Sequence, residues 1–254
     1  TPVCDGSLGG RLMQNFQTFE YVRNFVSRYA WMRAHSLLLV SGAFGAYRRD
    51  ALLRVGGFDP ECLVEDYELI HRLYRHAAEQ RLPWQIRVIG TAHARTSAPS
   101  SIHSFLRQRR RWFAGFLQTQ YWNRDMIGNR RFGTLGTLML PVKTMDTVQP
   151  ILGLAATGTL AGLVVAGRLP VATAILAIVA NKVLLDLVFH LWCVRLYRRW
   201  TGGRATAGYR LAAGVALLEP FSFQILRHLG ALLGWHHFLT GRRHWGKQTR
   251  HAMS

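Results

Sequence analysis

The spacing of apolar residues changes near residue 130 and divides the chain into two parts. In the first part, segments with apolar residues every three or four positions predict amphipathic helices. Two apolar runs, SLLLVSGAFGAY (36–47) and WQIRVIGTA (84–92), have the length and composition of buried strands. The helices are predicted within 1–35 after a loop, within RRDALLRVGGF, from about Glu65, and over 99–122. This order predicts an α/β fold up to about residue 130.

The helix predicted over 99–122 contains the basic run SFLRQRRRWFAGF, and the serines before this run offer an N-cap. Its apolar residues form one stripe: Ile102, Phe105, Leu106, Trp112, Phe113, Phe116 and Leu117. Gln108, Arg111 and Trp112 share a face because positions i, i+3 and i+4 are neighbours on a helix. An amide, a guanidinium and an indole that point together suit the binding of a phosphorylated sugar at a membrane surface.

Two long apolar segments follow in the second part. Residues 147–167 carry no charge over about the length that crosses a bilayer, and 171–194 form a second candidate span. The connection RLP is short, whereas 195–210 is rich in arginine. The positive-inside rule therefore places 1–146 and 195–210 in the cytoplasm.

Two further apolar segments are interrupted by polar residues. Residues 209–239 contain the dipeptides EP and RH, so a kinked or re-entrant element, an interfacial helix and a third span all remain open. Residues 132–146 are predicted as an interfacial helix. The chain ends in a basic tail.

The charge of the chain restricts its partners. The 254 residues carry a formal net charge of +19, and lysine occurs only at positions 143, 182 and 247, so arginine dominates. Such a balance suggests an anionic partner, namely phospholipid, a phosphate-bearing substrate or nucleic acid. The three cysteines have no metal-ligand spacing, which argues against a disulfide framework and fits a reducing compartment.

Two motifs could carry chemistry. Glu65 and Asp66 begin a helix, where acidic residues commonly complement the dipole; alternatively, Asp66 is a general base for a sugar hydroxyl and Glu65 holds the local geometry. The run QRRRW is either a solvated basic face that anchors lipid headgroups or a binding site. In a binding site, arginine neutralises a diphosphate leaving group and tryptophan stacks on a sugar ring.

The order SGAFGAYRR, GGFD, VEDYEL and QRRRW, followed by apolar spans, resembles the membrane-embedded family-2 glycosyltransferases, which include cellulose, chitin and hyaluronan synthases. The resemblance runs from about Phe19 to the C-terminal WGKQTR. It implies inverting transfer from a nucleotide sugar, expected to be a UDP-sugar, to a glycan or lipid-linked acceptor. The implied partners are this donor, this acceptor and membrane lipids, with no nucleic acid. The implied location is the cell membrane, with several spans and a cytoplasmic catalytic part.

The resemblance also assigns domains and site residues. Residues 1–130 are similar to the C-terminal, acceptor-side half of a GT-A-like catalytic domain, and 131–254 to its interfacial and transmembrane α-helices. It implies the following roles: Asp66 and Glu65 catalytic, Gln108 and Arg111 on the donor diphosphate, and Trp112 under the acceptor sugar. Gly42 and Ala43 would give a sugar access to backbone, with tight packing as the alternative. His93 would line the acceptor side, with a hydrogen-bonded loop as the alternative.

The sequence departs from the family pattern at three points. Val64 stands where the cellulose-synthase-like form has threonine before Glu-Asp. The uridine-binding aspartate and the D-x-D metal motif are expected upstream, so the chain is expected to be N-terminally truncated and inactive alone. The full-length enzyme is expected to use Mg²⁺ or Mn²⁺, for which this chain supplies no identified ligands. No segment matches the gating loop of cellulose synthases, so processive synthesis has no support.

Charged residues outside the motifs have more than one interpretation. Arg107, Arg109 and Arg110 are assigned to the membrane surface or to structural pairing, and Arg109→Ala is expected mostly to weaken membrane association. Lys182 and Asp186 in the second span are interpreted as a pair that is satisfied against another helix, or, with His190, as a polar path for a glycan.

Two other classes of function compete with the enzyme. One is a non-catalytic basic scaffold that grips anionic lipid. The other is a nucleic-acid-binding protein.

Overall fold

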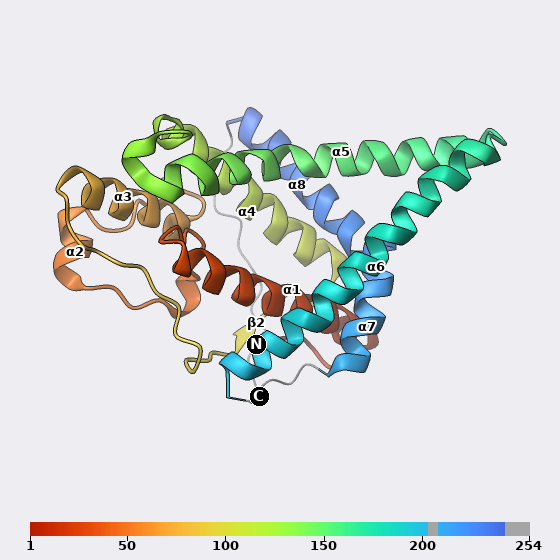
Figure 1. Cartoon of the computed structure of the whole chain (residues 1–254), viewed down its shortest axis with the longest axis horizontal. Coiled ribbons are helices and arrows are strands. Elements are labelled where there is room, and N and C mark those ends of the chain that lie inside the picture. Colours follow the sequence, from red (N-terminus) through yellow and green to blue (C-terminus); the bar gives the residue numbers. More distant parts are fainter. Residues whose placement is uncertain (203–207, 242–254) are drawn as a thin grey trace.

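The computed structural model describes residues 1–202 and 208–241, and helices dominate it (Figure 1). The α-helices are α1 (Leu8–Arg33), α2 (Arg49–Arg54), α3 (Glu65–Glu79), α4 (Ile102–Trp122), α5 (Leu140–Val165), α6 (Leu169–Trp200), α7 (Tyr209–Leu218) and α8 (Phe223–Leu239). The shorter turns are η1 (Gly42–Phe44), η2 (Arg124–Met126), η3 (Arg130–Phe132), the π-helical η4 (Leu135–Met139) and η5 (Glu219–Phe221). Two strands, β1 (Pro2–Val3) and β2 (Thr96–Ser97), form a parallel pair in which Pro2 is opposite Thr96.

The two strands predicted over 36–47 and 84–92 are absent from the described part of the chain, so that prediction is wrong. A strand needs a neighbouring strand for its backbone groups, and within the described ranges neither segment has one. Leu37 and Leu38 are nevertheless fully buried. An apolar run predicts that its side chains are buried, but it does not predict a strand. Here an irregular segment buries these side chains without forming a sheet.

The predicted helices of the first part are present, and local residues explain their ends. The Ser101 hydroxyl accepts a hydrogen bond from the Ser104 N–H and starts α4 with a reciprocal capping box. After α2, Gly56 and Gly57 adopt φ values of 81° and 74°, which side chains disfavour, so the helix stops there.

The core consists of two groups of buried side chains. In the first, Phe16 of α1 stacks on Phe223 of α8 at 5.1 Å between ring centroids, and Phe105 of α4 packs against the same ring. The second lies around the start of α3 and joins Val64, Tyr67 and Ile70 to the following residues: Met126, Leu135, Met139 and Leu140. Together they hold α1, α3, α4 and α8 as one body.

The basic helix α4 lies along α8. A Cβ added at Gly230 would come within 2.5 Å of the Arg109 Cβ, and one at Gly234 within 2.7 Å of the Phe113 Cβ. Two glycines therefore let the helices approach closely. Phe105 and Leu106 of the apolar stripe pack with side chains of α1 and α8. Trp112 and Phe116 pack in the second buried group, and Ile102 remains 55% exposed.

The end of α5 and the start of α6 extend away from this body and meet at a tight turn (Figure 1), whereas Cys193 and Val194 of α6 belong to the first buried group. Segments Leu135–Val165 and Pro170–Trp200 are each 31 residues long and apolar enough to cross a membrane. The segment predicted as an interfacial helix, 132–146, contains the end of η3, η4 and the first turns of α5.

The apolar segment 209–239 is folded as two helices, because η5 separates α7 from α8 at Glu219–Phe221. Pro220 lies at this break, where it can donate no backbone hydrogen bond. The basic tail, 242–254, and part of the arginine-rich segment, 203–207, lie outside the described residues.

The buried His71 makes the stability of the α3 region depend on pH. Its side chain is fully buried, and desolvation lowers its pKa from 6.5 to about 4. Between these values the unfolded chain binds the proton and the folded chain does not, so stability is complete above pH 6.5 and falls as the pH drops towards 4. The shift corresponds to about 3 kcal/mol.

We predict that His71→Met flattens the dependence of the unfolding free energy on pH between 4.5 and 6.5. Urea denaturation in detergent, followed by circular dichroism, measures this dependence. His228, whose pKa burial also lowers, titrates in both proteins, so the comparison is between the two slopes. His35→Asn is the control because His35 is exposed and asparagine tolerates its φ of 52°. Equal slopes in wild type and His71→Met would contradict the prediction.

Candidate active site

The start of α3 is fixed directly onto α4. The Leu63 N–H donates to Oε1 of Gln118 at 3.1 Å, and Nε2 of Gln118 donates to the Glu61 carbonyl at 3.2 Å. A Cβ at Gly115 would lie 2.6 Å from Cγ2 of Val64, so only glycine lets this valine rest on α4. These contacts hold the acidic pair that follows Val64 beside the QRRRW helix.

Asp66 is held in place by backbone donors. Its Oδ2 accepts a hydrogen bond from the Gly42 N–H at 2.6 Å, and its Oδ1 accepts from the Tyr67 N–H at 2.8 Å. Gly42 begins the exposed turn η1, and Ala43 follows it on the surface. The carboxylate is thus oriented by the segment that was predicted as a strand, although that segment is a loop.

The residues predicted for the donor side, Gln108 and Arg111, come from α4. Nη1 of Arg111 donates to the Leu63 carbonyl at 3.1 Å. Burial lowers the pKa of Arg111, and the charges of Glu65 and Asp66 act in the opposite direction, so the arginine lies within electrostatic range of the acidic pair. Gln108 is 8% exposed, and its buried Oε1 has no hydrogen-bond partner among the described residues.

One cavity, of about 1850 Å³, connects these groups. All eight residues predicted for the site line it: Gly42, Ala43, Glu65, Asp66, His93, Gln108, Arg111 and Trp112. His93 lies in the irregular stretch before β2 and makes no hydrogen bond to the other seven within the described ranges. The structure therefore brings the predicted residues to one cavity.

Arg28 and Tyr47 are among the further residues that line the same cavity and were not predicted for the site. Burial lowers the pKa of Arg28, against the effects of Tyr21 and Asp66. Burial raises the pKa of Tyr47, and the charges of Asp66 and Glu65 add to this effect. Arg28 lies on α1 outside any motif, so no sequence signal identified it. Tyr47 could have been found because it closes the same loop as Gly42.

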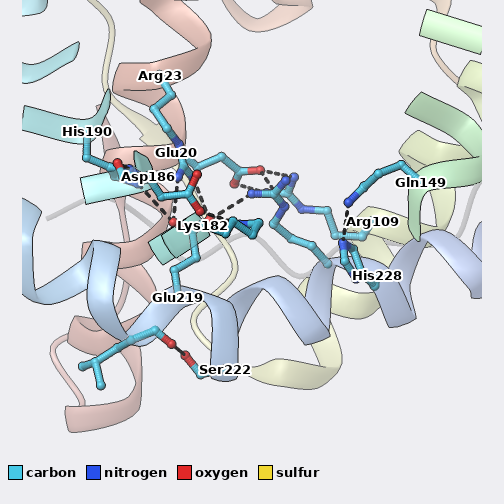
Figure 2. Close-up of polar contacts among 12 residues, drawn as sticks. Glu20, Arg23, Arg109, Gln149, Lys182, Asp186, His190, Glu219, Ser222 and His228 are labelled. Atoms are coloured by element: carbon cyan, nitrogen blue, oxygen red, sulfur yellow. Dashed lines mark hydrogen bonds and ion pairs between the residues drawn. The ribbon is translucent and has the colours of Figure 1, made fainter. Parts of the chain in front are cut away.

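The expectation that Arg109 lies at the membrane surface is wrong. Its guanidinium forms two hydrogen bonds, of 2.7 and 2.5 Å, with the buried carboxylate of Glu20 (Figure 2). The alternative interpretation, that Arg109 forms a structural ion pair, is correct. Loss of Arg109 would leave a buried carboxylate, a larger effect than loss of a lipid contact.

The charged residues of α6 make separate contacts. Lys182 and Asp186 pair within the helix at 2.5 Å rather than with another helix. Nε2 of His190 lies 3.3 Å from Oε2 of Glu219, and both side chains are buried (Figure 2). His190 therefore links α6 to the break between α7 and α8.

Within residues 1–202 and 208–241, no three His, Cys, Asp or Glu side chains are grouped so that they could hold a metal ion. The described residues thus do not fit the divalent cation that the family resemblance implies.

Comparison with known proteins identifies the class to which this arrangement belongs. The model of Glycosyl transferase family group 2 matches residues 2–197, which include both motifs and most of α6. The chain is therefore a member of this family, whose activity is glycosyl transfer from nucleotide sugars. No curated protein and no solved structure matches the chain.

We predict that Gly42→Ala lowers the rate of glycosyl transfer at least about tenfold, because a lost hydrogen bond to a charged group costs about 1.5–3 kcal/mol. The added Cβ would lie 2.9 Å from Oδ2 of Asp66, so the carboxylate must move. Nucleoside diphosphate release from a UDP-sugar, in membranes that contain the natural gene product, measures the rate. Gly9→Ala is the control because its Cβ meets no atom within 4 Å. An unchanged rate in Gly42→Ala would show that this contact does not orient Asp66.

Proposed function

We propose that the protein catalyses inverting transfer of a sugar from a UDP-sugar to a glycan or lipid-linked acceptor at the cytoplasmic face of a membrane. The observation that carries the proposal is the position of Asp66, oriented by two backbone N–H groups in the cavity that Arg111 and Trp112 also line. Membership of the family supplies the reaction class, and the two long apolar helices support the membrane location.

The proposed mechanism begins with the acceptor hydroxyl. Its oxygen attacks the anomeric carbon of the donor while Asp66 accepts the hydroxyl proton. The bond from that carbon to the diphosphate oxygen breaks, and the nucleoside diphosphate leaves with the electron pair. Attack opposite the leaving group inverts the anomeric centre. Glu65, which precedes Asp66 in the first turn of α3, is assigned to the local geometry of this turn.

The leaving group and the acceptor are assigned to α4. Arg111 neutralises charge that develops on the diphosphate, and Gln108 donates to it through its amide nitrogen. The Trp112 ring carries the acceptor sugar, with Gly42, Ala43 and His93 on the acceptor side. A half-buried arginine suits this role because its charge acts more strongly away from bulk water.

We predict that Asp66→Asn lowers transfer at least about a hundredfold, which is the contribution typical of a general base. The substitution keeps the size of the side chain and an oxygen for the Gly42 N–H. The assay uses UDP-glucose, UDP-galactose, UDP-N-acetylglucosamine and UDP-glucuronate as donors, with cellotetraose and chitotetraose as acceptors. Asp59→Asn, before α3, is the control. Wild-type turnover that Asp66→Asn leaves intact would refute the role of Asp66.

We also predict different kinetic defects for Arg111→Ala and Trp112→Ala. Loss of Arg111 lowers both donor hydrolysis and transfer, because both release the diphosphate. Loss of Trp112 raises the KM for the tetrasaccharide and leaves donor hydrolysis in place. Identical defects in both variants would contradict this division of roles.

A scaffold that grips anionic lipid makes the opposite prediction. It would bind phosphatidylserine vesicles and turn over none of the four donors. Such a result would contradict the proposed enzyme and support the scaffold. Asp66→Asn would then have no effect on vesicle binding.

A further inference from the structure

The Trp112 ring is stacked on a guanidinium that is itself buried. The Cζ atom of Arg109 lies 4.8 Å from the centroid of the Trp112 ring and 4.6 Å from that of Phe105. These three residues follow one another at i, i+4 and i+7 on α4, so Arg109 lies between the two rings. Attraction between a cation and an aromatic face strengthens when both groups are removed from water.

Glu20 of α1 fixes this guanidinium. Both carboxylate oxygens accept hydrogen bonds from Arg109, and the two side chains are only 13% and 7% exposed. Burial alone would raise the pKa of Glu20, but Arg109 and then Arg227 outweigh it and lower the pKa. The carboxylate is therefore charged and determines where the Arg109 side chain can lie.

The same carboxylate is connected to the candidate membrane helix α6. Nε of Arg227 lies 3.9 Å from Glu20, and its Nη1 donates to Glu219 at 3.0 Å. Glu219 accepts two hydrogen bonds from Arg23, of 2.6 and 2.7 Å, and contacts His190 of α6 (Figure 2). Four helices thus contribute to one network that ends at the Trp112 ring.

We infer that Glu20 is a positioning residue for the acceptor, acting on Trp112 through Arg109. Buried ion pairs contribute little net stability compared with apolar side chains of the same volume, but they fix geometry because neither charge can leave alone. Arg109 also lines the cavity in which the donor diphosphate is proposed to bind. Pairing with Glu20 keeps this guanidinium on the tryptophan ring and away from the phosphates.

This inference rests on the proposed function, because it needs Trp112 to carry the acceptor. Without the Glu20 charge, Arg109 would turn towards water or phosphate, and the ring would lose its stacked neighbour. The acceptor should then bind less tightly, whereas the general base and Arg111 remain in place. Acceptor binding and donor chemistry should therefore respond differently to one substitution.

The test compares Glu20→Gln, Arg109→Lys and wild type in membranes that contain the natural gene product. The substrates are the UDP-sugar and the tetrasaccharide, cellotetraose or chitotetraose, that the wild-type protein turns over. We expect the acceptor KM to rise about tenfold in both variants, because a tenfold change lies between the energies of an exposed and a desolvated cation–aromatic pair. The donor KM and the rate of donor hydrolysis without acceptor should change by less than about twofold.

Glu68→Gln is the matched control. Glu68 is also a buried carboxylate paired with an arginine, Arg72, at 2.6 Å, but no aromatic ring stacks on that guanidinium among the described residues. The Glu68→Gln variant should lose stability, as Glu20→Gln does, but its KM for the acceptor should equal that of wild type. If Glu20→Gln and the control both lower all rates in step with the folded fraction, the ion pair is merely structural and the inference is wrong.

Failure of the proposed function gives a different result. In that case wild type turns over no donor, or Trp112→Ala leaves the acceptor KM unchanged. The inference about Glu20 fails by itself when Trp112→Ala raises the acceptor KM and Glu20→Gln does not.

Discussion

The candidate site depends on the close contact between the start of α3 and the middle of α4. Gly115 has no side chain, so Val64 rests on the helix surface, and Gln118 binds the backbone on either side of Cys62. A residue with a Cβ at position 115 would push α3 away by the width of a methyl group. The acidic pair and QRRRW belong to one cavity because these two residues hold them together.

The second constraint is the removal of charge from water. Glu20 and Glu219 are both buried, and arginines surround each of them: Arg109 and Arg227 for Glu20, Arg23 and Arg227 for Glu219. Arg227 is shared, so neither carboxylate can be considered alone. Burial would raise the pKa of Glu219, but His190 and Arg23 lower it. A break in the helix at Pro220 brings this carboxylate to the junction of α1, α6 and α8.

Helices were predictable from the sequence because their signals are local. Ser101 caps α4, paired glycines end α2, and long apolar runs identified α5 and α6. The prediction of strands at 36–47 and 84–92 was wrong for a physical reason. Pairing requires a second segment, and an apolar run contains no information about whether one is present. The motif residues of the site were predicted by family resemblance; they line one cavity, and their roles there stay predictions.

The partners of the arginines could not be predicted in this way. Glu20 and Arg109 are separated by 89 residues, and Arg23 and Glu219 by 196. No periodicity relates such positions, so a basic run looks the same whether it meets lipid, phosphate or buried carboxylates. Burial distinguishes these cases. The four arginines of QRRRW and its preceding turn have different environments: Arg109 is neutralised by Glu20 and stacked on Trp112, whereas Arg111 faces the cavity that Asp66 lines. A single run of like charges therefore contains both a structural ion pair and a candidate ligand for phosphate.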